Sequence, residues 1–297
     1  MDNFIIIRGA RIQVPFECRN WVNDPTGVKL HTKVNARKRA CRLITTHTVH
    51  GRTCKRLRAG GKPSNRDLTW ARSHFNSERK ASTDAYVDTD GSVVWANDPA
   101  LAYTWGAGAV NPYAMHIELV TDEDGTLYED TLRSYGELVV ASARGLGIQL
   151  QTPWDPATGS PYAGRLIDCD PEREGRNTVG VIGHRNVWTH PTIIDPATKK
   201  PKRDASGKIL KDHTRYIPQR GFGDPNDLPF IWLVEKHGVE RQTFHLGAGQ
   251  TEPEVARVWK ERQKRLGIDA DGLPLAGTVA ALKAAGYPDG IWALRAA

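Results

Sequence analysis

Short apolar runs of strand length alternate along the chain with longer segments of helical period. Strands are expected at residues 41–47, 114–120 and 178–183, and a hairpin at residues 85–95 with its turn at Asp90-Gly91. Because strands and helices alternate without segregating, the pattern predicts an α/β fold with a mixed central β-sheet flanked by helices. The expected helices are residues 67–79, residues 131–146 ending at Gly147, and residues 229–236 ending at Gly238.

The pattern divides the chain into three parts. Residues 1–40 mix short apolar runs with turn residues and are expected to form an N-terminal extension packed on the main domain. Residues 41–240 carry the alternating strands and helices, interrupted by a polar insertion at about 195–220. A glycine-containing stretch at 247–253 predicts a linker, and residues 252–297 are expected to form a small helical unit.

The composition is that of a soluble globular protein, with 39% hydrophobic and 25% charged residues in a chain of 297. No apolar run is long enough to cross a bilayer, and the N-terminus lacks the basic segment of a secretion signal. We therefore expect synthesis in a cytoplasm without a signal peptide, and no membrane insertion. A net charge of +7 favours polyanionic partners, nucleic acid or the anionic polymers of a bacterial wall, although a solvated basic face explains it equally well.

None of the four cysteines forms a CxxC pair, which argues against a structural zinc knuckle. They are expected to be buried thiols of a reducing compartment, with a Cys41–Cys54 bridge as the alternative. The four are Cys18, Cys41, Cys54 and Cys169.

Separated polar residues stand within or directly after the predicted strands. His47 ends the first strand, Glu118 lies within the second, and His184 follows the third. Two imidazoles and a carboxylate form a complete first shell for a catalytic Zn²⁺ ion that keeps one position open for water. A further carboxylate nearby would handle protons.

Each of these residues also has a simpler interpretation. A histidine at the end of a strand is often structural, and the aspartates of Asp195-Pro196 and Asp224-Pro225 are common turn formers. Glu118 lies in an apolar strand, where a carboxylate is costly to bury unless it is paired or functional. The alternative for Glu118 is an edge strand that faces solvent.

Five short motifs follow one another in a specific order. They are LITTHTVHG at 43–51, DAYVDTDG at 84–91, AGAVN with HIEL at 107–119, VIGHRNV at 181–187, and GDPN with Phe230 and Trp232 at 223–232. In order and spacing, residues 41–238 resemble the zinc-dependent N-acetylmuramoyl-L-alanine amidases of the type-2 amidase and peptidoglycan-recognition-protein superfamily. Many phage endolysins belong to that superfamily.

The resemblance implies that His47 and His184 bind Zn²⁺ and that Glu118 is the catalytic acid–base group. The third ligand would be the aspartate of an Asp-Pro pair. Asp195 lies at the short separation in sequence from His184 that is usual in the family. Asp224 is instead followed, as in the family, by a predicted helix that opens with an aromatic pair. We favour Asp224, with Asp195 as its rival.

The chain departs from the family at several points. The histidine of the family's AWHAG motif is Gly106 here, and the histidine of its SxH motif is Asp84. The lysine or threonine that the family often has two residues before its last ligand is also missing, a role for which Arg220 or Thr192 is available. The substrate-binding residues are expected to be Trp105, Asn111 and Arg220.

The function implied by the resemblance is hydrolysis of the amide bond between N-acetylmuramic acid and L-alanine in bacterial peptidoglycan. Residues 252–297 partly resemble a peptidoglycan-binding helical domain, with a simple helical tail as the alternative. We expect a monomeric phage endolysin made in the host cytoplasm that acts on the wall after release, with anionic wall polymers as further partners. Two other classes stay open: a non-catalytic recognition module of the same fold, and a nucleic-acid-binding protein. The latter rests on charge alone and lacks a reading helix or aromatic platform, so no nucleic acid is expected.

Overall fold

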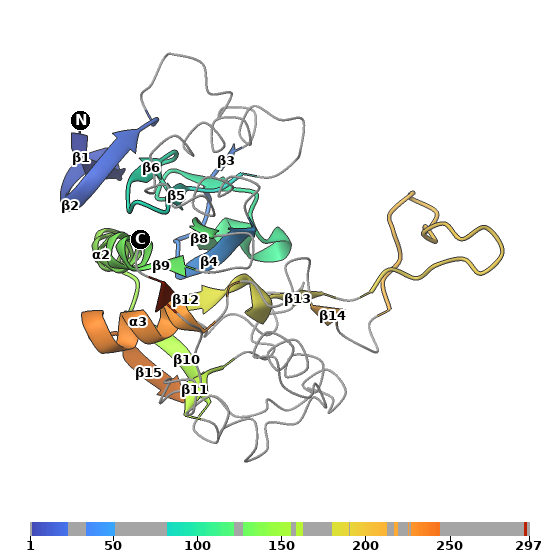
Figure 1. Cartoon of the computed structure of the whole chain (residues 1–297). Helices are drawn as coiled ribbons and strands as arrows, with labels where there is room; N and C mark the ends of the chain where they lie inside the picture. The colour runs from blue at the N-terminus through green and yellow to red at the C-terminus, as the bar shows by residue number, and fades with distance from the viewer. Residues whose placement is uncertain are drawn as a thin grey trace, which may run out of the picture.

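The largest sheet in the described part of the chain has seven strands in mixed orientation (Figure 1). Its order is β1-β2-β6-β5-β8-β4-β12, and β5, β8, β4 and β12 run parallel to one another. The strands are β1 (Asp2–Ile7), β2 (Ala10–Asn20), β4 (Leu43–His50), β5 (Ala85–Val87), β6 (Val93–Trp95), β8 (Ala114–Thr121) and β12 (Gly180–Gly183). The computed structural model describes residues 2–22, 34–50, 82–121, 127–155, 159–162, 180–189, 191–212, 217–218, 225, 227–243 and 294–295.

Helices α2 (Glu129–Leu146) and α3 (Leu228–His237) share a hydrophobic core with one face of the sheet. Period-2 alternation places Ile44, Met115 and Ile117 in this core, and the Thr46 hydroxyl lies 2.7 Å from the Tyr135 hydroxyl of α2. The opposite face of the sheet contributes to a smaller apolar cluster that includes Leu43, Ala114 and Ile182. The sheet is therefore covered on one face by helices and is free to carry polar side chains on the other.

Smaller elements complete the described chain. A three-stranded sheet has the order β11-β10-β15, and three two-stranded ladders pair β13 with β14, β16 with β9, and β3 with β7. No helix in the described part of the chain is long and apolar enough to span a membrane. The bounds are β3 (Val34–Ala36), β7 (Ala102–Thr104), β9 (Leu127–Tyr128), β10 (Gln151–Asp155), β11 (Ser160–Pro161), β13 (Trp188–Thr189), β14 (Ile217–Pro218), β15 (Glu240–Thr243) and β16 (Leu294–Arg295), with short 3-10 turns η4 (Gly108–Tyr113) and η6 (His184–Asn186).

The predicted α/β class with a mixed central sheet is confirmed. The two helices end where expected, because Gly147 and Gly238 adopt the left-handed conformation (φ of 73° and 63°) that closes a helix at low cost. Residues 2–20 do more than pack on the domain, since β1 and β2 extend the central sheet beyond β6. The expected helix at 67–79 lies outside the described residues, as does the C-terminal unit apart from β16.

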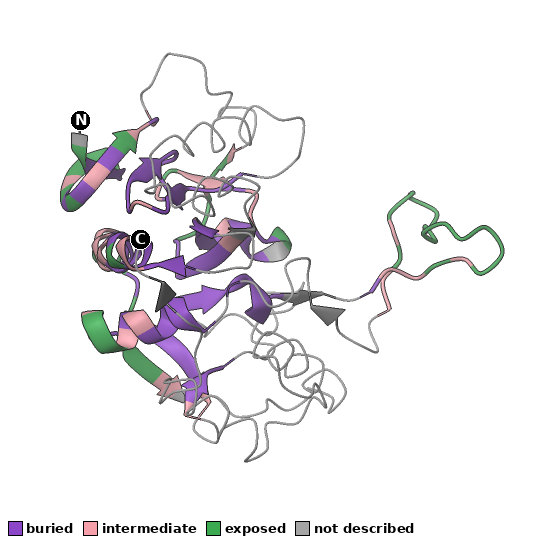
Figure 2. Ribbon diagram, viewed as in Figure 1, coloured by how far each residue is buried: buried purple, intermediate pink, exposed green. Residues whose placement is uncertain are grey.

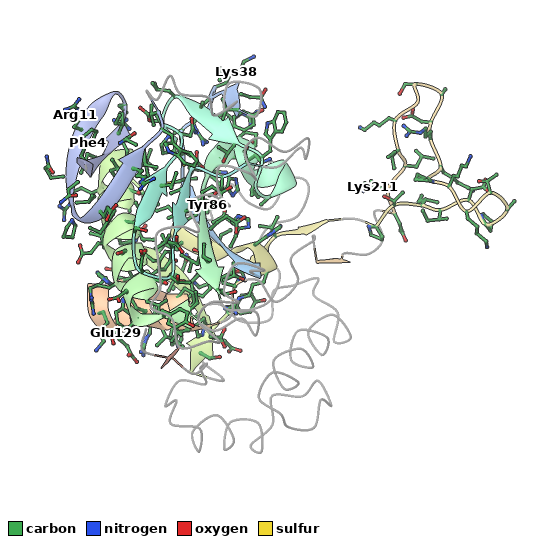
Figure 3. All side chains as sticks on the ribbon, turned by 45° about the horizontal axis from the view of Figure 1, so that its top comes forward. Phe4, Arg11, Lys38, Tyr86, Glu129 and Lys211 are labelled. Atoms are coloured by element: carbon green, nitrogen blue, oxygen red, sulfur yellow. The ribbon has the colours of Figure 1, made fainter. Side chains whose placement is uncertain are left out.

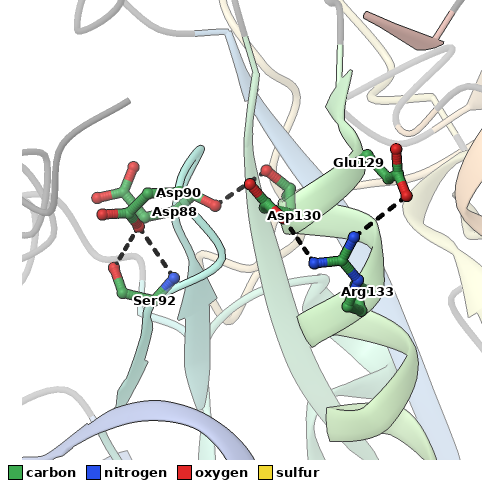
Figure 4. A network of polar contacts seen from close by, with 7 residues as sticks. Asp88, Asp90, Ser92, Glu129, Asp130 and Arg133 are labelled. Atoms are coloured by element: carbon green, nitrogen blue, oxygen red, sulfur yellow. Dashed lines mark hydrogen bonds and ion pairs between the residues drawn. The ribbon is translucent and has the colours of Figure 1, made fainter. Parts of the chain in front are cut away.

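The hairpin of β5 and β6 has the expected Asp90-Gly91 turn. Figure 4 shows the Asp90 carboxylate accepting hydrogen bonds from the backbone N–H and the hydroxyl of Ser92, at 2.9 and 2.6 Å. Gly91 has a φ of 80°, and a Cβ atom there would lie 2.8 Å from the carbonyl oxygen of Asp130. The turn therefore needs glycine both for its backbone conformation and for its close approach to the start of α2.

The polar excursion is a loop at residues 191–212 that extends away from the body (Figures 1 and 2). Figure 3 shows the same arrangement, with Lys211 on the loop and Tyr86 in the centre of the molecule. Isolated bridges pair Thr192 with Lys211 and Ile194 with Pro201. Its exposed cations are Lys199, Lys200, Lys202, Arg203 and Lys208.

Cys18 and Cys41 are buried, and neither forms a disulfide. Burial raises the pKa of Cys41 to about 11, so this thiol is inert at neutral pH. Because Cys41 forms no disulfide, the alternative of a Cys41–Cys54 bridge is wrong; Cys54 and Cys169 themselves lie outside the described residues.

Candidate functional site

A row of polar side chains crosses the parallel strands on the face opposite α2. Glu118 of β8 is paired in register with Tyr86 of β5 on one side and with His47 of β4 on the other. Gly183 is the last residue of β12 and pairs with Thr46, so His184 follows at the level of His47. Side chains in register on neighbouring strands share a face. The fold thus brings together three residues separated by more than sixty positions in the sequence.

The row contains a contact between two imidazoles, and a third joins it from β8. His47 Nδ1 lies 3.1 Å from His184 Nδ1, and His47 Nε2 lies 3.1 Å from His116 Nδ1. The ring of His47 is tilted by 59° to that of His184 and by 54° to that of His116. His116 precedes Glu118 by two residues in the same strand and therefore projects from the same face.

Burial controls the protonation of this cluster. Burial lowers the pKa of His184 to about 4, and burial together with the neighbouring charges of His184 and Arg37 lowers the pKa of His116 to about 3. The pKa of His47 is also held well below its usual value by burial and by the two neighbouring imidazoles. All three side chains are therefore neutral at pH 7, which is the form in which imidazole binds a metal ion.

The distance between His47 Nδ1 and His184 Nδ1 fits a shared metal ion. Two nitrogens bound tetrahedrally at zinc–nitrogen distances of about 2.05 Å would lie about 3.3 Å apart, close to the observed 3.1 Å. Within the described residues no group of three or more His, Cys, Asp or Glu side chains is arranged to hold a metal ion. The described residues could thus supply two imidazole ligands, His47 and His184, to such an ion.

Glu118 stands beside the imidazole pair and is only half-buried. The neighbouring phenol of Tyr86 is buried, and burial together with the negative charge of Glu118 raises the pKa of Tyr86 well above its ordinary value. Tyr86 is therefore a neutral hydroxyl next to the carboxylate. Since Glu118 keeps contact with solvent, it is the carboxylate of the row that a water molecule can reach.

A buried ion pair holds the segment that carries His184. Arg185 Nη1 lies 2.6 Å from Asp227 Oδ1 and donates to the carbonyl oxygen of Pro225 at 3.2 Å. Gly183 packs against Pro225, since a Cβ atom at Gly183 would meet Pro225 Cδ at 3.0 Å. The backbone that directly follows Asp224 therefore lies against the residues on both sides of His184.

The rival aspartate has a different environment. Asp195 is partly exposed on the extended loop, where its Oδ1 atom accepts hydrogen bonds from the backbone N–H groups of Ala197 and Thr198 at 2.8 and 2.9 Å. These bonds lower the pKa of Asp195. The carboxylate is thus used to close its own turn, as an Asp-Pro pair in a loop commonly does.

The expected substrate-binding residues are placed as follows. The side-chain oxygen of Asn111 accepts a hydrogen bond from the backbone N–H of Ala107 at 2.7 Å and so closes the η4 turn. Trp105 is half-buried, and its backbone N–H donates to the Ser82 hydroxyl at 2.9 Å. Arg220 lies outside the described residues, as does Asp224.

Two buried residues of the site were missed by sequence reasoning. His116 is one, and alternation with Glu118 along β8 is the signal that could have found it. Asp84 is the other: its carboxylate accepts hydrogen bonds from Asn97, Thr104 and the backbone of His116. Burial raises the pKa of Asp84 to about 6. No local pattern marks a residue whose role is to join four separate segments.

The fold and the site define a mixed α/β protein with a buried pair of neutral imidazoles beside a half-exposed carboxylate. No protein-family model matches the chain, and no curated protein matches it. Among solved structures, PlyL matches over 46% of this chain and 76% of its own length, with 14% identity and a TM-score of 0.33. The hydrolase AmiA of Staphylococcus aureus matches over 59% of this chain and 68% of its own length, with 12% identity and a TM-score of 0.33. A mutant of PlyL matches over 46% and 78%, with 14% identity and a TM-score of 0.35.

Proposed function

We propose that this protein is a zinc-dependent peptidoglycan hydrolase that cleaves the amide bond between N-acetylmuramic acid and the L-alanine of the stem peptide. The observation that carries the proposal is the 3.1 Å separation of His47 Nδ1 and His184 Nδ1, in register with Glu118 on the adjacent strand. Two neutral imidazoles at this spacing suit a metal ion, and a reachable carboxylate beside them suits proton transfer. The order of sequence motifs supports the choice of bond.

The third zinc ligand is proposed to be Asp224. Pro225, the next residue, packs against Gly183 and accepts a hydrogen bond from Arg185, so the chain at this point runs beside His184. The rival Asp195 uses its carboxylate within the extended loop. Two histidines and one aspartate leave one position open, which is the arrangement of a catalytic rather than a structural zinc site.

The chemistry follows from the placement of the side chains. A bound zinc ion would act as a Lewis acid toward water and toward the lactyl carbonyl group of the substrate. Glu118 accepts the proton of the attacking water and delivers it to the nitrogen of the leaving L-alanine as the carbon–nitrogen bond breaks. The products are a muramoyl carboxylate and a peptide with a free amino terminus.

The proposed partner is bacterial peptidoglycan, and the proposed setting is that of a phage endolysin acting on the wall of its host. The net charge of +7 favours retention on anionic wall polymers. The extended loop adds to this, since it carries five exposed cations. Such retention would raise the local concentration of substrate around the site.

Glu118→Gln tests the chemical step. Purified protein with one equivalent of Zn²⁺ is incubated with walls of several chemotypes, and released muramoyl carboxylates and new alanine amino termini are measured by mass spectrometry. We expect Glu118→Gln to lower the rate by at least about 100-fold, the usual contribution of a general acid–base group, while zinc content is unchanged. Glu137→Gln on α2 is the matched control and should keep full activity.

Two outcomes would contradict the proposal. One is equal cleavage by wild type and Glu118→Gln. The other is binding of peptidoglycan without release of new amino termini from any chemotype, which would make the protein a non-catalytic recognition module of the same fold.

A further inference from the structure

We infer that His116 is a positioning residue that holds the ring of His47 in the orientation and tautomer required for metal binding. The inference rests on the proposed function, because it needs a metal ion at His47 and His184. Its starting point is that the His47 ring contacts a different histidine at each of its two nitrogens, both at 3.1 Å. One imidazole cannot direct both of its nitrogens at one ion, so only one of these contacts belongs to a metal site.

Exposure decides which of the two edges binds the metal. His116 has no exposed surface, whereas His184 is 9% exposed and stands at the carboxyl end of β12. Glu118, two residues further along β8 than His116, is half-buried. A catalytic ion must be reached by water and substrate. The edge of His47 that faces His184 meets this requirement, and the edge that faces His116 does not.

The proton positions follow from this assignment. A ring that offers the lone pair of Nδ1 to a metal ion carries its proton on Nε2. The Nε2–H group of His47 then donates to Nδ1 of His116, which fixes the ring in place. This is the usual second partner of a metal-binding histidine, supplied here by another imidazole in place of a carboxylate or carbonyl group.

His116 is itself held rigidly. Its backbone N–H donates to the Asp84 carboxylate at 2.7 Å, and its carbonyl oxygen accepts from the Asp84 N–H and the Thr83 hydroxyl at 3.0 and 2.7 Å. Its ring packs on Gly106, where a Cβ atom would lie 2.5 Å from His116 Cγ. The absence of a side chain at position 106 therefore makes room for the imidazole of His116.

The other ring nitrogen of His116 argues against a purely structural role. Nε2 is buried and has no hydrogen-bond partner among the described residues. An unsatisfied buried polar atom costs about 1–3 kcal/mol. An imidazole placed only for packing would be better replaced by an apolar side chain, so the contact with His47 is the reason for a histidine at this position.

The experiment measures zinc affinity by chelator competition for wild type, His116→Asn and His116→Leu. Asparagine keeps an acceptor oxygen close to the position of Nδ1, whereas leucine has a similar volume and no acceptor. We expect His116→Leu to bind zinc roughly 10- to 100-fold more weakly than wild type, and His116→Asn to stay within about threefold. His237→Leu, which removes a histidine from α3, is the matched control and should be unchanged.

Gly106→Ala is a second variant that leaves every histidine in place. It should displace the His116 ring and weaken zinc binding in the same direction. In the zinc-loaded wild type, long-range proton–nitrogen NMR correlations should show the proton of His47 on Nε2, and this signal should shift in His116→Asn. Far-ultraviolet circular dichroism confirms folding of each variant.

Three results would overturn the inference. If wild type loses zinc on His47→Ala and His184→Ala while His116→Leu binds as tightly as His237→Leu, the positioning role fails and the proposed function stands. If His116→Asn loses zinc as fully as His47→Ala, His116 is a direct ligand instead. If wild type binds no zinc, the inference and the proposed zinc chemistry fail together.

Discussion

At the scale of single residues, three imidazoles in contact have a consequence for stability at low pH. Burial lowers the pKa of His184 to about 4 and that of His116 to about 3, and it also lowers the pKa of His47. In the unfolded chain the same side chains titrate near their ordinary value of about 6.5. Below that pH the unfolded state binds more protons than the folded state, so stability falls as the pH falls.

The metal-free protein should therefore be destabilised by mild acid. The free energy of unfolding, measured by urea denaturation in the presence of a chelator, should drop by several kcal/mol between pH 7.5 and pH 5. Each imidazole that is protonated in the unfolded chain but neutral in the folded protein contributes about 1.4 kcal/mol per pH unit below 6.5. Asp84 acts in the opposite direction, because its pKa is raised to about 6 in the folded state. The contribution of this single carboxyl group to the pH dependence offsets at most that of one of the three imidazoles.

His116→Asn is the control for this dependence, since it removes one titrating group and should flatten the slope. Equal stability at pH 7.5 and pH 5 would show that the three side chains are not buried as neutral imidazoles.

Some residues of the site could be predicted from the sequence more readily than others. His47, Glu118 and His184 stand in short motifs with apolar neighbours, so each could be found from local context. His116 could have been found from its alternation with Glu118 along β8, whereas Asp84 could not, because its role depends on which strands lie beside β5 and β8. The role of Asp224 as the third ligand remains a prediction, based on the helix that follows it in the sequence and on the position of Pro225 beside Gly183.

At the scale of elements, local chemistry was sufficient where a turn or a cap decides the structure. The ends of α2 and α3 at Gly147 and Gly238, and the hairpin with Asp90-Gly91, were all predicted. The strands β1 and β2 were not, because β2 pairs in parallel with β6 more than seventy residues away, and a local pattern carries no information on such pairing.

The contact between the hairpin turn and α2 gives a test at this scale (Figure 4). Gly91→Ala should destabilise the protein by about 1–3 kcal/mol, because a Cβ atom at this positive φ meets the Asp130 carbonyl oxygen at 2.8 Å. Arg133→Ala, on the same turn of α2, removes exposed ion pairs with Glu129 and Asp130 and should change stability by no more than about 0.5 kcal/mol.

Thermal or urea unfolding of the two variants measures the difference. An equal loss of stability in both would mean that the turn is not packed on the helix as described.

At the scale of the whole molecule, the sheet explains how distant segments of sequence meet. In neighbouring parallel strands, residues at matching register positions project from the same face and lie side by side, so His47 within β4 and Glu118 within β8 meet although neither ends its strand. His47, Glu118 and His184 come from three such strands that are adjacent in the sheet but dispersed in the sequence. The extended loop at 191–212 separates His184 from the Asp224-Pro225 pair in sequence, while Pro225 lies against Gly183 in space.

The zinc content of purified protein tests the central claim most directly. Elemental analysis of wild type and of four single alanine variants, at His47, His184, Asp195 and Asp224, reports which side chains hold the ion. We predict one zinc per chain in wild type and in Asp195→Ala, and loss of zinc in His47→Ala, His184→Ala and Asp224→Ala. Wild type without stoichiometric zinc, or zinc that survives removal of both imidazoles, would contradict the account.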